Sequence, residues 1–91
     1  MTVRVKFFAY FRDVFGGRER EVAVDGSPSV RDLLAAVADT PARRAEIFAG
    51  DGLKAHLVVM VNGVHVHSLQ GLETRLAPGD TVAVFPFLGG G

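Results

Sequence analysis

The chain has 91 residues, 48% of them apolar and 22% charged, which leaves room for one small domain with a single core. Ten Lys and Arg balance ten Asp and Glu, so electrostatics gives no reason to expect a nucleic acid or an anionic membrane as partner. Without cysteine, the chain cannot form a disulfide, a thiolate metal site or a cysteine nucleophile. Residues 1–6 do not resemble a signal peptide, and no apolar run approaches the roughly 20 residues that span a bilayer. These features predict a cytoplasmic protein.

The first quarter of the chain predicts two paired strands. Residues 3–10 begin with a period of two and are rich in β-branched and aromatic side chains, which indicates a strand. The residues expected on its core face are Val3, Val5 and Phe7. Residues 11–15 break the alternation, and Gly16 and Gly17 form a turn. Residues 19–24 alternate again, and the short connection predicts antiparallel pairing with the first strand.

The next segment predicts the main helix. Ser29 is expected to cap its N-terminus, with Asp32 in the place of the usual Glu of a capping box. The spacing of one buried helical face is followed by Val30, Leu33, Leu34 and Val37. Pro41 ends this helix, because the residue before a proline disfavours helical geometry. A second short helix over residues 42–48 and a loop over residues 49–52 are expected to follow.

The second half of the chain again predicts strands. Residues 57–61 are continuously apolar and of strand length, which indicates a central strand that is buried on both faces. Asn62 and Gly63 predict a tight hairpin turn, because both central positions of such a turn need positive φ. A short strand over residues 64–67 follows, and residues 70–76 are expected to form a short helical turn or loop.

The last predicted strand covers residues 81–85, and Pro86 ends its ladder because proline has no N–H to donate. A sheet with one apolar face and one main helix to cover it is a two-layer α+β fold. Three glycines follow at residues 89–91. Glycine loses more backbone freedom on ordering than any other residue, so these glycines predict a thin tail rather than a packed element.

Several segments, in this order, resemble the β-grasp sulfur carriers, the ubiquitin-like MoaD/ThiS-like family. They are Val61-Asn62-Gly63 and residues 71–76, 78–82 and 85–91. Residues 5–12 and 29–34 are similar to the small subunit of molybdopterin synthase in particular. The resemblance implies a β-grasp domain over residues 1–88, with a mixed sheet of four to five strands packed on one main helix. It also implies a flexible C-terminal tail over residues 89–91.

The resemblance further implies a chemistry at Gly91, with Gly90 as a thin stalk that a narrow channel can enclose. An E1-like adenylating enzyme would use ATP and magnesium to convert the Gly91 carboxylate into an acyl-adenylate. Sulfur from a persulfide donor would then replace AMP and leave a thiocarboxylate. The large subunit of molybdopterin synthase, or another sulfur-accepting enzyme, would receive that sulfur. The chain itself would bind no cofactor or metal stably, and would be the non-catalytic subunit of any enzyme it belongs to.

Five residues are candidates for partner contact: Phe8, Phe85, Phe87, Leu88 and Gly89. Phe87 and Leu88 are expected to anchor the root of the tail or to touch the partner. Gly89 occupies the position where the family commonly has a small residue, which leaves the last two glycines as the terminal pair. Periodicity leaves open whether Phe8 and Phe85 fill the core or face outward.

The destination of the sulfur stays open at this level. The resemblance of residues 5–12 and 29–34 favours molybdopterin (or tungstopterin) synthesis as the pathway that receives the sulfur. The long loop over residues 43–56, in contrast, resembles carriers that include one used in cysteine synthesis. Thiamine synthesis is a further alternative. Two other classes remain: a ubiquitin-like modifier joined through Gly91 to a lysine, and a binding module with an inert tail. His65 and His67 would share one face of a strand, and without an obvious third ligand they are predicted to face solvent rather than to bind a metal.

Overall fold

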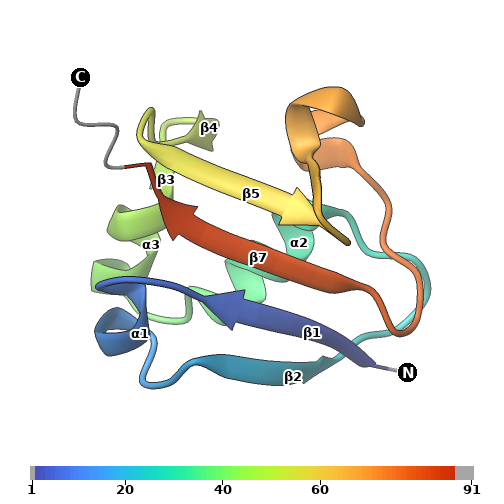
Figure 1. The fold of residues 1–91 in the computed structure, drawn as a ribbon, viewed down its shortest axis with the longest axis horizontal. Helices are drawn as coiled ribbons and strands as arrows, with labels where there is room; N and C mark the ends of the chain where they lie inside the picture. Colours follow the sequence, from blue (N-terminus) through green and yellow to red (C-terminus); the bar gives the residue numbers. More distant parts are fainter. Residues whose placement is uncertain (1, 88–91) are drawn as a thin grey trace.

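The computed structural model describes residues 2–87 and arranges them in two layers, a five-stranded sheet with helices on one face (Figure 1). The strand order is β2-β1-β7-β5-β6. The strands are β1 (Thr2–Phe7), β2 (Glu19–Ala23), β5 (Leu57–Val61), β6 (Val64–His65) and β7 (Thr81–Pro86). The first and last strands are parallel, and the other neighbours are antiparallel, including the predicted pair of β1 and β2. The two-layer α+β prediction is confirmed.

The main helix, α2 (Val30–Val37), begins where the sequence predicts. The Ser29 hydroxyl accepts a hydrogen bond from the Asp32 N–H at 3.1 Å, and the Asp32 carboxylate accepts one from the Ser29 N–H at 3.1 Å. This capping box satisfies two amide groups that the first turn leaves without partners. The four predicted core residues of the helix are all buried: Val30, Leu33, Leu34 and Val37.

The chain leaves β1 earlier than the sequence predicts. The strand ends at Phe7 rather than at residue 10, because Ala9 adopts a left-handed conformation with φ of 55°. The short helix α1 (Phe11–Val14) follows, where only a break in alternation was predicted. Its aromatic residues explain the difference, since Phe11 and Phe15 are buried and the Phe15 ring stacks on Phe7 at 4.5 Å.

The segment after α2 contains more structure than predicted. The second helix is confirmed as α3 (Pro41–Ile47), with the Thr40 side chain capping its first turn. The predicted loop over residues 49–52 is instead part of a small hairpin of β3 (Phe48–Ala49) and β4 (Gly52–Leu53). Strands of two residues are too short to show an alternation, which is why the sequence pattern missed them.

The Asn62-Gly63 turn is confirmed, with φ of 50° and 83° at its two central residues. The strand after it is shorter than predicted. It ends at His65, and the chain continues as a 3-10 helix, η1 (Val66–Ser68), because Val66 turns inward and is buried. The helical turn expected within residues 70–76 is present as a second 3-10 helix, η2 (Gly71–Glu73).

The prediction that β5 is buried on both faces is wrong. Alternate residues of the strand lie in the core, whereas Val58 and Met60 are half-buried on the face of the sheet that carries no helix. β7 ends at Pro86 as predicted, and one more backbone hydrogen bond follows it, from the Phe87 N–H to the His56 carbonyl. Within residues 2–87, no helix is long and apolar enough to cross a membrane. The expected tail over residues 89–91 lies outside the described residues.

Candidate functional site: the open sheet face and the end of β7

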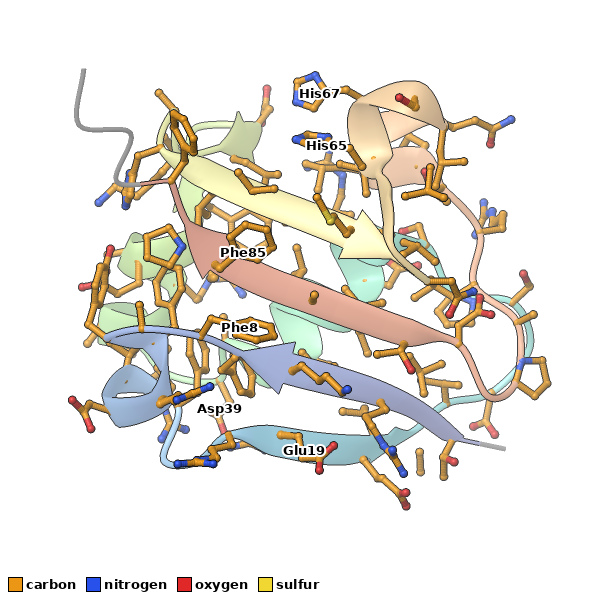
Figure 2. All side chains as sticks on the ribbon, viewed as in Figure 1. Phe8, Glu19, Asp39, His65, His67 and Phe85 are labelled. Atoms are coloured by element: carbon orange, nitrogen blue, oxygen red, sulfur yellow. The ribbon has the colours of Figure 1, made fainter. Side chains whose placement is uncertain are left out.

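The site begins with two aromatic rings on the sheet face turned away from the helices. Phe8 directly follows β1 and Phe85 lies on β7, and their rings meet edge to face with centroids 5.7 Å apart (Figure 2). Phe8 is 37% exposed and Phe85 is half-buried. Both therefore face outward, which resolves the alternative that periodicity left open.

These rings belong to a larger apolar surface, here called the open-face patch. It surrounds a shallow hollow of about 460 Å³ that is lined by Phe8, Ala9, Met60, Ala83, Phe85 and Pro86. Met60 and Ala83 are direct cross-strand partners, and the small alanine leaves the space between the larger side chains. Contiguous exposed apolar surface on a small protein is typical of a binding site for another molecule.

Charged side chains lie on the neighbouring part of the same face, over β1 and β2. Arg4 forms ion pairs with Glu19 at 3.4 Å and with Glu21 at 3.2 Å. Lys6 lies between Glu19 and Ala83 in the strand register, at the border of the open-face patch. The Arg12 guanidinium lies 5.6 Å from the centre of the Phe8 ring, and its Nε donates to the Phe7 carbonyl. The face is thus divided into an ionic half and an apolar half.

The open-face patch continues directly into the last described residues of the chain. Pro86 is buried and pairs with Leu57 at the start of β5, so the end of β7 is fixed to the sheet. Phe87 follows with a 65% exposed side chain, although its N–H is bound to the His56 carbonyl. The other predicted site residues, Leu88, Gly89, Gly90 and Gly91, lie outside the part of the chain that the structure describes.

A side-chain hydrogen bond lies beside this end of β7. The Tyr10 hydroxyl and the His56 Nε2 are 3.0 Å apart. Loss of solvent contact, and then the negative charge of Glu46, raise the pKa of Tyr10 above its usual value of 10.0. Sequence reasoning did not single out either residue, because Tyr10 was assigned to a strand and 46 residues separate the two.

His65 and His67, whose spacing raised the possibility of a metal site, have adjacent rings but lie on different elements. The ring centroids of His65 and His67 are 4.5 Å apart, with His65 on β6 and His67 on η1 rather than on one strand (Figure 2). The His67 N–H donates to the His65 Nδ1 at 3.1 Å, which occupies that nitrogen's lone pair. Residues 2–87 contain no group of three His, Asp or Glu side chains placed to hold a metal ion.

The parallel pair formed by the first and last strands, the one main helix across them and the apolar open face define a ubiquitin-like β-grasp protein. The chain belongs to the ThiS family, whose family model matches residues 5–91. This is a family of sulfur carriers and ubiquitin-like modifiers.

Relatives and solved structures agree with this assignment over the whole chain. Small archaeal modifier protein 3 of Haloferax volcanii is 35% identical over 92 residues, which cover 100% of both chains. The crystal structure of SAMP1 from Haloferax volcanii is similar at a TM-score of 0.82, with 35% identity and full coverage of both chains. A putative molybdopterin converting factor, subunit 1, from Pyrococcus furiosus has a TM-score of 0.76 and 33% identity, covering 94% of this chain and 97% of that one.

Proposed function

We propose that this protein is a sulfur carrier that transfers sulfur from a thiocarboxylate at Gly91. The observation that carries the proposal is the family match, which extends through the terminal glycines to Gly91 and so includes the residues on which the chemistry depends. An unmodified carboxylate is a poor electrophile, so the chain needs a partner enzyme to activate it. Gly90 and Gly91 suit a narrow active-site channel because they add no side chain to the backbone.

The proposed reaction has three balanced steps. The Gly91 carboxylate attacks the α-phosphorus of ATP, with magnesium on the phosphates, and pyrophosphate leaves as the acyl-adenylate forms. The terminal sulfur of a persulfide donor then attacks the carbonyl carbon, and AMP leaves. A second thiol breaks the resulting acyl disulfide, which releases the thiocarboxylate and leaves the donor oxidised to a disulfide. An E1-like enzyme catalyses the first step, and this chain supplies only the reacting terminus.

The open-face patch is the proposed docking surface for these partners, with Phe8, Phe85 and Phe87 as its main contacts. Its apolar hollow is continuous with Pro86, where the chain leaves the sheet, so docking there brings the following residues to the partner's active site. Leu88 and Gly89 are then the next residues to enter the partner. Buried aromatic side chains commonly dominate the energy of such interfaces.

The proposed destination of the sulfur is molybdopterin, with this chain as the small subunit of a molybdopterin synthase. The similarity to the Pyrococcus furiosus protein described as subunit 1 of a molybdopterin converting factor supports this choice. Carriers for cysteine or thiamine synthesis share the same activation chemistry and are the alternatives within this class. The proposed site of action is the cytoplasm, where ATP and persulfide donors are available.

Protein modification is the second candidate function, because the similar Haloferax volcanii protein is named as a small archaeal modifier. In that case a lysine amine of a target attacks the acyl-adenylate, or a thioester derived from it, and an isopeptide bond to Gly91 forms as AMP, or the thiol of the thioester, leaves. Both functions share the adenylation step. They differ in the nucleophile, which is a sulfur for the carrier and a nitrogen for the modifier.

The test is intact-mass analysis of the protein purified from its native cells. The carrier function predicts a gain of about 16 Da that alkylation of the thioacid shifts further, whereas methionine oxidation adds nearly the same mass without that reactivity. Conjugates joined through Gly91 support the modifier function, and accumulation of a molybdopterin precursor on deletion of Gly91 supports the proposed destination. Native protein with neither thiocarboxylate nor conjugates contradicts both functions.

A further inference from the structure

The geometry points to Tyr10 and His56 as positioning residues that set the direction in which the C-terminal segment leaves the fold. This inference rests on the proposed function, because direction matters only if the end of the chain must reach a partner's active site. Tyr10 and His56 are assigned no part in the chemical step itself. Their role is exerted through the backbone at Phe87.

β7 lies between β1 and β5 in the sheet, and it is parallel to β1 and antiparallel to β5. The end of β1, the start of β5 and the end of β7 therefore lie at one edge of the sheet. Tyr10 follows β1 and His56 precedes β5, so their 3.0 Å hydrogen bond connects the two neighbours of β7 where the chain leaves the sheet.

His56 directly binds the backbone at Phe87, where the chain leaves the sheet. Its carbonyl accepts the hydrogen bond from the Phe87 N–H, while its ring is bound to Tyr10. Pro86, one residue earlier, has a fixed φ and is buried. Phe87 is thus restrained on one side by the proline ring and on the other by a histidine whose own side chain is anchored.

A strained backbone turn precedes Tyr10 and determines where its side chain lies. Ala9 adopts a φ of 55°, a left-handed conformation that costs a non-glycine residue about 1 kcal/mol or more. This turn carries the chain out of β1 and brings Tyr10 to His56. The same turn leads Phe11 into the core, where its burial helps to offset the strain, and leaves Tyr10, which is 39% exposed, at the surface beside His56.

The consequence for the reaction follows from chain length. The four residues after Phe87 reach at most about 14 Å when fully extended, so a small change in the exit direction moves the terminal carboxylate by several ångströms. A docked carrier with a loosened exit still binds its partner, but its carboxylate spends less time in reacting geometry. Misplacement of a reacting group lowers the rate of the chemical step more than it lowers binding.

The experiment compares Tyr10→Phe and His56→Phe with His67→Phe as the matched control. The first two variants remove the hydrogen bond and keep an aromatic ring, and the third makes the same substitution at an exposed histidine that takes no part in that hydrogen bond. Without any partner, hydrogen exchange of the Phe87 amide should be about tenfold faster in the first two variants and unchanged in the control. The double variant Tyr10→Phe/His56→Phe should differ less than twofold from either single variant, because both remove one interaction.

The second measurement uses the E1-like activating enzyme and follows pyrophosphate exchange. The kcat for adenylation should fall about tenfold in Tyr10→Phe, with the KM for the carrier unchanged, because the docking surface is intact. A wild-type exchange rate at Phe87, or a loosened Phe87 amide with unchanged kcat, overturns the inference. Wild-type protein that the activating enzyme does not adenylate overturns the proposed function instead, and the two failures are therefore distinct.

Discussion

At the scale of single residues, two adjacent phenylalanines lie in opposite environments. Phe7 is 2% exposed and stacks on Phe15 in the core, while Phe8 is 37% exposed on the open face. The alternation at the start of the chain predicts the buried position of Phe7. The position of Phe8 does not follow from this alternation, because β1 ends at Phe7 and the chain turns at Ala9.

This difference in burial predicts losses of stability of different size for two alanine substitutions. Phe7→Ala should lower the free energy of unfolding by about 3–5 kcal/mol, as expected for a buried aromatic side chain whose removal leaves a cavity. Phe8→Ala loses one exposed ring contact and should lower it by less than about 1 kcal/mol. Urea unfolding measures both changes.

Partner binding supplies the complementary measurement. Calorimetric titration with the activating enzyme should show at least about a tenfold weaker Kd for Phe8→Ala, since an exposed aromatic anchor is lost from the interface. Val64→Ala, another exposed apolar residue but on the short edge strand, serves as the control and should bind like the wild type. Equal binding by Phe8→Ala and Val64→Ala would contradict the assignment of the open-face patch as the docking surface.

At the scale of elements, local chemistry explains which predictions hold. The α2 capping box and the Asn62-Gly63 turn each depend on residues that are close together in the sequence, and both form as predicted. The helix α1 and the hairpin of β3 and β4 were missed, since each is too short for a periodic pattern and depends on packing against distant residues. The Tyr10–His56 bond belongs to the same group, because only the assembled sheet brings its two residues together.

The capping box predicts a pH dependence of stability. The Ser29 N–H, and then the Ser29 hydroxyl, hold the pKa of Asp32 below its ordinary value of 3.8. A carboxylate whose pKa is lowered by folding stabilises the native state above its unfolded pKa, and this contribution is lost as the pH falls through the folded pKa. The difference in free energy of unfolding between the wild type and Asp32→Asn should therefore be full at neutral pH and shrink below pH 3.8.

Urea unfolding across this pH range measures the difference. Ser29→Ala is the companion variant, because it removes the hydroxyl and keeps the backbone N–H that contributes most to the shift. It should lower the free energy of unfolding by about 1 kcal/mol while leaving part of the pH dependence in place. A difference between wild type and Asp32→Asn that stays constant down to acid pH would show that the carboxylate does not act through the cap.

At the scale of the whole molecule, the two ends of the chain form the centre of the sheet. Residues of β1 and β7 are separated by most of the sequence, yet Val5 pairs with Val82 and Phe7 with Val84 in parallel register. Periodicity predicts that both segments are strands, but it carries no information on which strands are neighbours. The family resemblance supplied that information, because the ordered set of motifs implied the β-grasp arrangement.

This topology predicts that truncation can separate the residues needed for folding from the proposed reactive tail. Val82 and Val84 are fully buried in the core, and β7 joins the two halves of the sheet, whereas residues 89–91 are glycines with no side chain to bury. A chain that ends at residue 88 should therefore unfold with the same free energy as the full chain and lose adenylation entirely. A chain that ends at residue 83 loses Val84, Phe85 and Pro86, the second half of β7. With them it loses three of the five residue pairs with β5 and one of the four with β1. Circular dichroism should show no cooperative unfolding transition for this shorter chain, and a cooperative transition there would mean that the second half of β7 is dispensable for the fold.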